Sequence, residues 1–338
     1  MVTSPSLQRL WQRGCDFLGT PFAIMGGAMS WVSERHLVAA ISNGGGFGVI
    51  ACGSMSPELL LEEIRGTKVL TRKPFGVNLI TMHPQLDQLI DVCLAEKMTH
   101  IVLAGGLPSA PAIKKIKSSG AKLICFTPTA TLGKRLVRMG ADALVIEGME
   151  AGGHIGPVST SVLAQEILPE IRDVPVFVAG GIGRGEAITS YLEMGASGVQ
   201  LGTRFVCATE SIAHPKFKRA FIHAAARDAV PSIQFDARFP VIPVRALANK
   251  ASKRFLEKQR EVIARFDDGE LTKDQAQLEI EHFWAGALRR AVIEGDVESG
   301  SVMAGQSVGM VTKEQPTVEI LNELLEQAEK ALRQRLSK

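Results

Sequence analysis

Short apolar, β-rich runs alternate with longer helical patterns through residues 22–206, which restricts the chain to folds built from repeated βα units. The strand-like runs are 22–25, 47–51, 75–80, 100–104, 122–126, 143–147, 174–179 and 198–201. The helical segments between them are 33–42, 57–70, 84–96, 111–119, 130–139, 160–171 and 184–194. Roughly eight strands, each followed by a helix or a long connection, is the count of a (β/α)8 barrel.

Glycines at the ends of the predicted helices support the same interpretation. Gly120, Gly140 and Gly195 stand where a helix would end in a left-handed residue before the next strand begins. The alternative is an open doubly wound sheet, which would use fewer repeats and normally a phosphate loop after its first strand. We therefore expect an α/β protein whose residues 15–206 form a (β/α)8, or TIM, barrel.

The βα rhythm stops after Phe205, so the rest of the chain is expected to be organised differently. Residues 207–300 predict a mainly helical insertion, a lid over the barrel mouth, with an antiparallel helix pair at 253–266 and 272–294. Thr272 and Gln275 fit a capping box at the start of the second helix. Residues 301–338 would form a loop and then a C-terminal helix, whose apolar face, from Val318 to Leu332, packs on the barrel.

Composition excludes several classes of protein. Of 338 residues 46% are hydrophobic and 22% are charged, which is typical of a folded globular chain. The net charge of +3 argues against a nucleic-acid partner. The five cysteines show no spacing typical of zinc or iron–sulfur sites, so we expect no metal. No apolar stretch approaches the roughly 20 residues of a membrane span, and we expect a cytoplasmic protein without a membrane partner.

Glycine pairs follow several predicted strands, at the end of a barrel where active sites form. The late ones are the most informative: Gly180 and Gly181 follow the seventh strand, and Gly202 and Thr203 follow the eighth. Barrels commonly bind phosphate at this place through exposed backbone N–H groups. The alternative is that these glycines only make turns.

His154 lies in the segment Glu147-Gly-Met-Glu-Ala-Gly-Gly-His-Ile-Gly156, directly beyond the sixth strand. A histidine there can serve as a proton donor or a hydrogen-bond partner near neutral pH, or it can simply cap a turn. Glu147 and Glu150 could orient His154, bind ligand hydroxyls or cap a helix. Since no nucleophile elbow or metal motif is present, a cofactor is the simplest source of chemistry.

These residues resemble a family of FMN-dependent barrel enzymes, the flavin-containing (type II) enoyl-acyl carrier protein reductases and the nitronate monooxygenases. The resemblance runs from about residue 20 to about residue 314. Its most specific segments are Met25-Gly-Gly-Ala-Met-Ser-Trp31, Lys73-Pro-Phe-Gly-Val-Asn78, the His154 segment, Gly202-Thr-Arg-Phe205, Glu210-Ser-Ile-Ala-His-Pro215 and Gly300-Ser-Val-Met-Ala-Gly-Gln306. The His154 segment and the segment from Gly295 to Gln306 are more similar to the reductase branch.

The resemblance implies an FMN site across the barrel mouth. The phosphate would lie at Gly180, Gly181, Gly202 and Thr203. The remaining contacts implied for the flavin are Met25, Gly26, Gly27, Asn78, Glu147, Gly153, Met303 and Gln306. His154 matches the active-site histidine of the family and is the catalytic residue we expect.

The implied reaction is reduction of the trans-2 double bond of an enoyl thioester in fatty-acid synthesis, with NADH or NADPH as hydride donor. The acyl group would be linked to acyl carrier protein or to coenzyme A, and a homodimer is possible. Arg245, Lys250, Lys253, Arg254, Lys258 and Arg260 would steer an acidic carrier, or would only form a solvated helix face. The alternatives are a nitronate monooxygenase, an NAD(P)H:quinone oxidoreductase, and a flavin- or phosphate-binding module without turnover.

Overall fold

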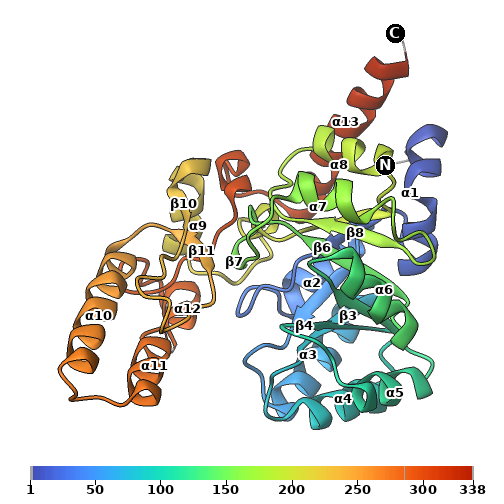
Figure 1. Cartoon of the computed structure of the whole chain (residues 1–338). Helices are drawn as coiled ribbons and strands as arrows, with labels where there is room; N and C mark the ends of the chain where they lie inside the picture. The colour runs from blue at the N-terminus through green and yellow to red at the C-terminus, as the bar shows by residue number, and fades with distance from the viewer. Residues whose placement is uncertain (1–2, 285, 337–338) are drawn as a thin grey trace.

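The computed structural model describes residues 3–284 and 286–336 and shows a closed barrel of parallel strands (Figure 1). The barrel strands are β1 (Ile24–Gly26), β2 (Gly48–Ala51), β3 (Phe75–Ile80), β4 (His100–Ala104), β5 (Lys122–Phe126), β6 (Ala143–Glu147), β8 (Val176–Ala179) and β9 (Gly198–Leu201). Neighbouring strands pair in parallel in the order β1-β9-β8-β6-β5-β4-β3-β2. Phe47 closes the ring, since its N–H donates to Ile24 O and its carbonyl accepts from Gly26 N–H, both at 2.8 Å. The predicted (β/α)8 barrel is confirmed.

Helices follow the strands and cover the outside of the barrel. They are α2 (Arg35–Asn43), α3 (Pro57–Leu70), α4 (Leu86–Ala95), α5 (Ala110–Ser118), α6 (Ala130–Met139), α7 (Thr160–Ile167) and α8 (Gly185–Glu193). The strand interiors are buried almost throughout, as the Val/Ile/Leu-rich strands of a parallel sheet require. An additional helix that the sequence did not indicate, α1 (Pro5–Leu18), precedes the first strand.

The C-terminal helix α13 (Thr317–Leu336) takes the eighth helical position of the barrel. It packs against α8 on one side and α2 on the other. Ile320, Leu321, Leu324 and Leu325 are buried on it, whereas Val318, which was expected on the apolar face, is 48% exposed. The insertion therefore lies between β9 and the helix that completes the last βα unit.

The insertion leaves the barrel after β9 and projects beside the mouth (Figure 1). Its helices are α9 (Pro215–His223), α10 (Lys250–Asp267), α11 (Lys273–His282) and α12 (Ala287–Arg289). The helix expected over 272–294 is wrong in extent, because α11 ends at His282 and the chain turns at Gly286, where φ is +69°. The predicted capping box is present: Thr272 Oγ1 accepts from Gln275 N–H, and Gln275 Oε1 accepts from Thr272 N–H.

The insertion has an apolar cluster of its own and a small sheet. Phe239, Phe255, Val262, Ala276 and Ile280 are buried together between α10 and α11. The sheet pairs β10 (Ala229–Pro231) with β11 (Val244–Leu247), and β11 with β7 (Gly153–His154), all antiparallel. The sequence did not predict this sheet, whose third strand comes from the barrel. No helix among the described residues is long and apolar enough to cross a membrane.

Candidate active site

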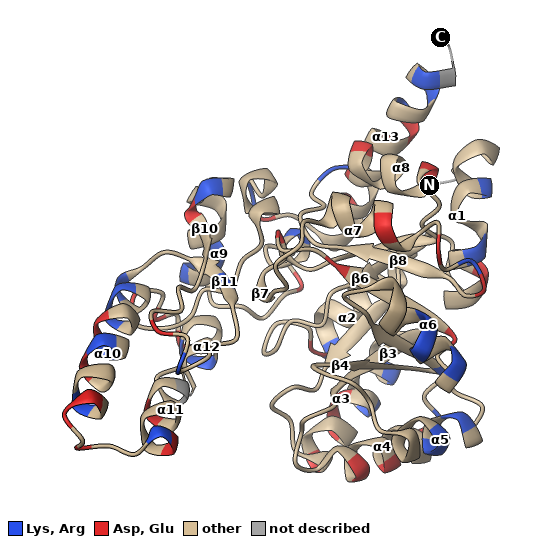
Figure 2. Ribbon diagram, in the orientation of Figure 1, with Lys and Arg blue, Asp and Glu red and all other residues tan. Residues whose placement is uncertain are grey.

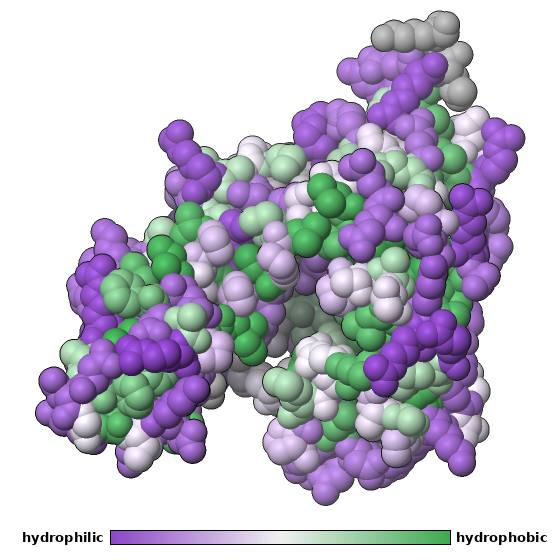
Figure 3. All heavy atoms as spheres, in the orientation of Figure 1, coloured by the Kyte–Doolittle hydropathy of each residue, from purple (hydrophilic) through white to green (hydrophobic). Residues whose placement is uncertain are grey.

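A cavity of about 700 Å³ opens at the carboxyl ends of the barrel strands, between the barrel and the insertion (Figure 3). Loops after β1, β3, β4, β6, β8 and β9 line one side, and residues of the insertion, such as Ile242 and Leu288, line the other. This is the end of a barrel where catalytic groups gather. The candidate site is therefore shared by the barrel and the insertion.

Glycines let the loops at the cavity floor approach one another. A Cβ added to Gly27 would lie 2.9 Å from Gly202 Cα, and one added to Gly152 would lie 2.6 Å from Gly305 N. Gly180 and Gly181 have φ of +96° and +69°, a conformation that other residues rarely adopt. The N–H group of Gly181 has no hydrogen-bond partner in the described chain. This lining offers backbone donors to an anion such as a phosphate.

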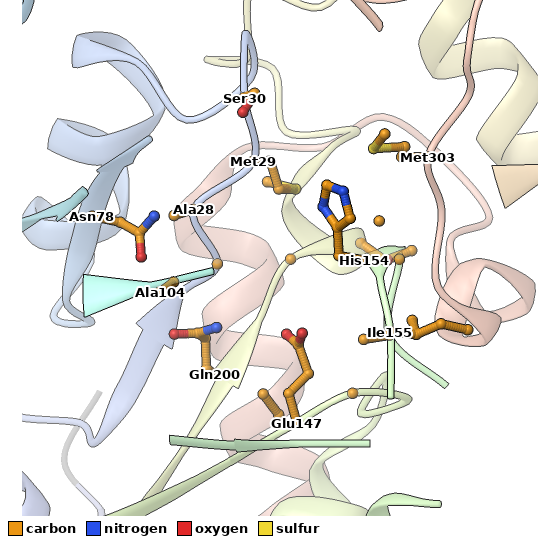
Figure 4. A pocket seen from close by; sticks show the side chains of 18 of the residues that line it. Ala28, Met29, Ser30, Asn78, Ala104, Glu147, His154, Ile155, Gln200 and Met303 are labelled. Atoms are coloured by element: carbon orange, nitrogen blue, oxygen red, sulfur yellow. The ribbon is translucent and has the colours of Figure 1, made fainter. Parts of the chain in front are cut away.

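Three polar side chains from different strands point into the cavity (Figure 4). Asn78 lies within β3 and is 5% exposed, and Gln200 lies within β9 and is 8% exposed. Glu147 is the last residue of β6. None of the three side chains has a hydrogen-bond partner within the described residues. Buried polar groups are normally satisfied, so these side chains are available to a polar ligand. Gln200 was missed, although a polar residue inside an otherwise apolar strand was the signal for it.

The carboxyl group of Glu147 lies at the bottom of this polar lining. Burial raises its pKa from the ordinary 4.5 to about 7. Loss of water disfavours the charged form, and no cation lines the cavity in the described chain to offset that loss. The group can therefore exist as a neutral hydrogen-bond donor or as a carboxylate near neutral pH.

His154 lies above Glu147 on the two-residue strand β7 and reaches the cavity with an exposed ring (Figure 4). Partial desolvation lowers the pKa of the imidazole below its usual value. Glu150 does not orient this ring, because its carboxylate binds Thr160 at the start of α7. His154 and Glu147 are the two ionisable side chains of the described cavity lining.

The loop before η4 (Gln306–Met310) brings Met303 to the cavity opposite Gly153. Thr203 fixes this loop, since its Oγ1 accepts a hydrogen bond of 3.0 Å from Gly305 N–H. Gln306 is anchored by its backbone, whose N–H donates to Glu150 O at 2.9 Å, and Ser307 rather than Gln306 lines the cavity.

The structure brings most of the predicted site residues to one cavity. The lining residues among them are Gly27, Asn78, Glu147, Gly153, His154, Gly180, Gly181, Gly202, Thr203 and Met303. Met25 and Gly26 lie two residues and one residue, respectively, before the first lining residue, Gly27, within β1, and Met25 is fully buried. Their contacts to a flavin, like that of Gln306, stay predictions. Other lining residues that the sequence did not indicate are Met29, Ser30 and Ile242.

Comparison with known proteins identifies the family. The nitronate monooxygenase family model matches residues 12–89 and 81–327. The chain belongs to this family. Members of this family are flavin-dependent oxidoreductases. The barrel and the cavity at its mouth are consistent with this class of enzyme.

Individual relatives differ in what they are named for. FabK from Thermotoga maritima is 35% identical, with a TM-score of 0.86 and coverage of 96% of this chain and 98% of FabK. The (3aS,4S,5R,7aS)-5-hydroxy-7a-methyl-1-oxo-octahydro-1H-indene-4-carboxyl-CoA dehydrogenase of Rhodococcus jostii is 29% identical, covering 88% of this chain and 89% of the relative. The nitronate monooxygenase of Paraburkholderia phytofirmans is 31% identical, covering 62% and 70%.

Proposed function

We propose that this member of the family binds FMN and uses NADH or NADPH to reduce the trans-2 double bond of an enoyl thioester. The observation that carries the proposal is the division of the cavity into a polar floor and an apolar wall. The floor holds Asn78, Glu147 and Gln200, whereas the wall includes Ile80, Met82 and Ile242. A flavin fits the floor, and an acyl chain fits the wall.

The residues present fit FMN. Gly180, Gly181, Gly202 and Thr203 would hold its phosphate through backbone and hydroxyl donors, and Asn78, Gln200 and Glu147 would bind polar atoms of the rest of the group. When bound, FMN supplies the capacity for hydride transfer, which protein side chains lack. The positive φ of Gly180 and Gly181 and the unpartnered N–H of Gly181 support this placement.

The side chains of this chain would account for the proton and for substrate binding. The net reaction adds a hydride from the nicotinamide to the β-carbon and a proton to the α-carbon of the thioester. His154 is positioned at the cavity either to deliver this proton or to donate a hydrogen bond to the thioester carbonyl. Met82 and Ile242, 72% and 59% exposed, would contact the acyl chain where it leaves the cavity.

The likeness to FabK, an FMN-dependent enoyl-acyl carrier protein reductase, supports the proposal and the role in fatty-acid synthesis. Nitronate monooxygenase activity is the second candidate, supported by the family model and by the relative in Paraburkholderia phytofirmans. The cavity walls do not separate the two reactions, since a nitronate is smaller than an acyl chain and would also fit.

Anaerobic stopped-flow spectroscopy tests the proposal. The flavin of the purified protein is reduced with NADH or NADPH and mixed with crotonyl thioester, or with a nitronate in oxygenated buffer. Rapid reoxidation by the thioester without oxygen is the expected result. Reoxidation that requires nitronate and oxygen, with the thioester inert, would instead assign the monooxygenase reaction. A protein that purifies without flavin and cannot be reconstituted with FMN would overturn both.

A further inference from the structure

One strand of the insertion supports two separate parts of the candidate site. At one end β11 pairs with β7, with Val244 opposite His154, and Ile155 N–H donates to Pro243 O at 3.0 Å. At the other end Ala246 forms an antiparallel bridge to Met303, and Leu247 N–H donates to Val302 O at 2.9 Å. The backbones that carry His154 and Met303 are therefore both bonded to the same four-residue strand.

Arg245 lies in the middle of this strand and is buried, with 2% of its surface exposed. Its Nε donates to Met149 O at 2.9 Å, and its Nη1 donates to Ala229 O at 2.5 Å. Met149 belongs to the loop between Glu147 and His154, and Ala229 begins β10. The guanidinium thus joins the barrel loop that presents His154 to the sheet of the insertion.

The partners of Arg245 are unusual for a buried cation. Within the described chain it forms no ion pair, and its guanidinium instead binds carbonyl groups of two segments, with Glu150 as a nearby negative charge. Burying a guanidinium costs free energy, which hydrogen bonds from its planar fork must offset. Because the planar guanidinium bridges two carbonyl groups, both its shape and its charge contribute to this contact.

We propose that Arg245 is a positioning residue that holds the His154 loop and, through β11, the Met303 loop in their arrangement at the cavity. The insertion then acts as part of the active site rather than only as a cover. The ordering of the two loops is independent of the reaction, whereas the consequence for turnover rests on the proposed function.

Three variants separate positioning from general stability. Arg245→Met removes the fork and keeps most of the side-chain volume, and Arg245→Lys keeps a buried charge that cannot bridge both carbonyls in the same way. The matched control is Arg238→Met. Arg238 binds Asp236 and Asp267 and lies over the rings of Phe239 and Phe266, so it stabilises the insertion without touching either loop.

Hydrogen exchange measured by mass spectrometry reads the two loops directly in the purified protein. In Arg245→Met we expect exchange in peptides covering 149–158 and 300–307 to accelerate about tenfold or more. The first segment loses the hydrogen bond to Met149 O directly, and the second loosens because β11, which pairs with it, loses its tie to Ala229 O. Arg245→Lys should give a smaller acceleration. Arg238→Met should accelerate exchange in α10 and α11 and leave both loop peptides unchanged.

Turnover supplies the second readout. We expect kcat for the enoyl thioester to fall about 10- to 100-fold in Arg245→Met at nearly unchanged flavin content, since small displacements of catalytic groups cost factors of this size. Unchanged exchange at 149–158, or equal acceleration there in Arg238→Met, would overturn the inference. If the wild-type protein does not reduce enoyl thioesters, the proposed function fails but the exchange result still decides the role of Arg245.

Discussion

The carboxylate of Glu150 accepts two hydrogen bonds from Thr160, one from the backbone N–H and one from the hydroxyl, each 2.9 Å long. The first N–H groups of a helix have no partner within the helix, and Glu150 satisfies one of them at the start of α7. The Thr160 hydroxyl also lies 3.1 Å from Gly180 O. Glu150 thus fixes the geometry beside the glycine pair. Among the described residues that line the cavity, the ionisable side chains are Glu147 and His154.

Glu147 makes the stability of the protein depend on pH. Its pKa is raised from 4.5 to about 7, so the folded state binds this proton more tightly than the unfolded state does. Deprotonation of Glu147 therefore lowers the free energy of unfolding. This loss is nearly absent below about pH 4.5, grows as the pH rises from about 4.5 to about 7, and is complete above about pH 7. For protein stripped of any flavin, we expect Glu147→Gln to be more stable than wild type at pH 8 by about 1 to 3 kcal/mol.

Urea unfolding of both proteins at pH 4.5 and pH 8 measures this difference, which should nearly vanish at the lower pH. Glu166→Gln, at an exposed position on α7, is the control for replacing a glutamate by its amide. A Glu147→Gln variant whose advantage is the same at both pH values would show that the carboxyl group is not held in its neutral form.

Alanine substitutions at Gly180 and Gly195 distinguish the effect of backbone strain from the effect on ligand binding. Both have positive φ, +96° and +106°, but a Cβ on Gly180 would lie 3.0 Å from Gly148 N and O, whereas one on Gly195 would meet nothing within 4 Å. We expect Gly195→Ala to lose about 1 kcal/mol of stability and to retain its flavin. Gly180→Ala should bind FMN about tenfold more weakly or worse, as losing about 1.4 kcal/mol of binding free energy implies.

Titration of flavin-free protein with FMN, followed by flavin fluorescence, measures both affinities. Thermal unfolding of the same samples shows whether each variant is folded. Equal FMN affinity in Gly180→Ala and wild type would show that the phosphate of FMN does not bind at this loop.

The barrel could be predicted because its signals are local. Each strand is a short apolar run that ends in glycine or a polar residue, and several predicted bounds, such as 75–80 and 143–147, agree with β3 and β6. The same rule places strand-end residues at one mouth, which is why Glu147, Gly180 and Thr203 meet in the cavity. None of these signals depends on contacts between distant segments of the chain.

The contributions of the insertion could not be predicted, because they depend on pairing between distant segments. β7 has two residues and is a strand only because β11 pairs with it. The paired residues His154 and Val244 are 90 positions apart in the sequence. Arg245 could not be assigned from the sequence for the same reason. Its neighbours Lys250 and Lys253 suggested a charged surface, whereas the structure shows that Arg245 is buried. Its partners are backbone carbonyls, which sequence does not reveal.

His154 should be needed for enoyl reduction and not for flavin binding. We expect His154→Ala to lower kcat for the enoyl thioester by about 10²- to 10⁴-fold, the range of a general acid, while the flavin content stays the same. His154→Gln distinguishes the two roles, because an amide donates a hydrogen bond but does not deliver a proton. His223→Ala, at the exposed end of α9, is the control.

Stopped-flow measurement of the two half-reactions checks this prediction. Recovery of most of the rate in His154→Gln would assign a hydrogen-bonding role, and failure to recover it would assign proton delivery. Enoyl reduction at the wild-type rate by flavin-loaded His154→Ala would exclude both.

The basic residues expected to steer an acidic carrier protein are reduced to a smaller set by the structure. Arg245 is buried, and Arg260 lies over the ring of Phe235. Lys250 pairs with Glu298, and Lys258 pairs with Glu261 and Glu279. Basic and acidic residues both lie along α10 (Figure 2). Lys253 and Arg254, near the start of this helix, are exposed and form no ion pair in the described chain. These two side chains are the ones that remain free to attract a carrier.

We expect charge reversal at both positions, Lys253→Glu with Arg254→Glu, to raise KM for a carrier-linked enoyl substrate about tenfold at low salt, because like charges slow encounter. KM for crotonyl-CoA should change little. The difference between wild type and the double variant should shrink as salt rises from about 0.05 M to 0.5 M, since screening shortens the reach of surface charges. Reversal of Arg135 and Arg138, on α6 at the barrel's outer wall, is the control, and an equal effect there would place the carrier elsewhere or assign the change to net charge alone.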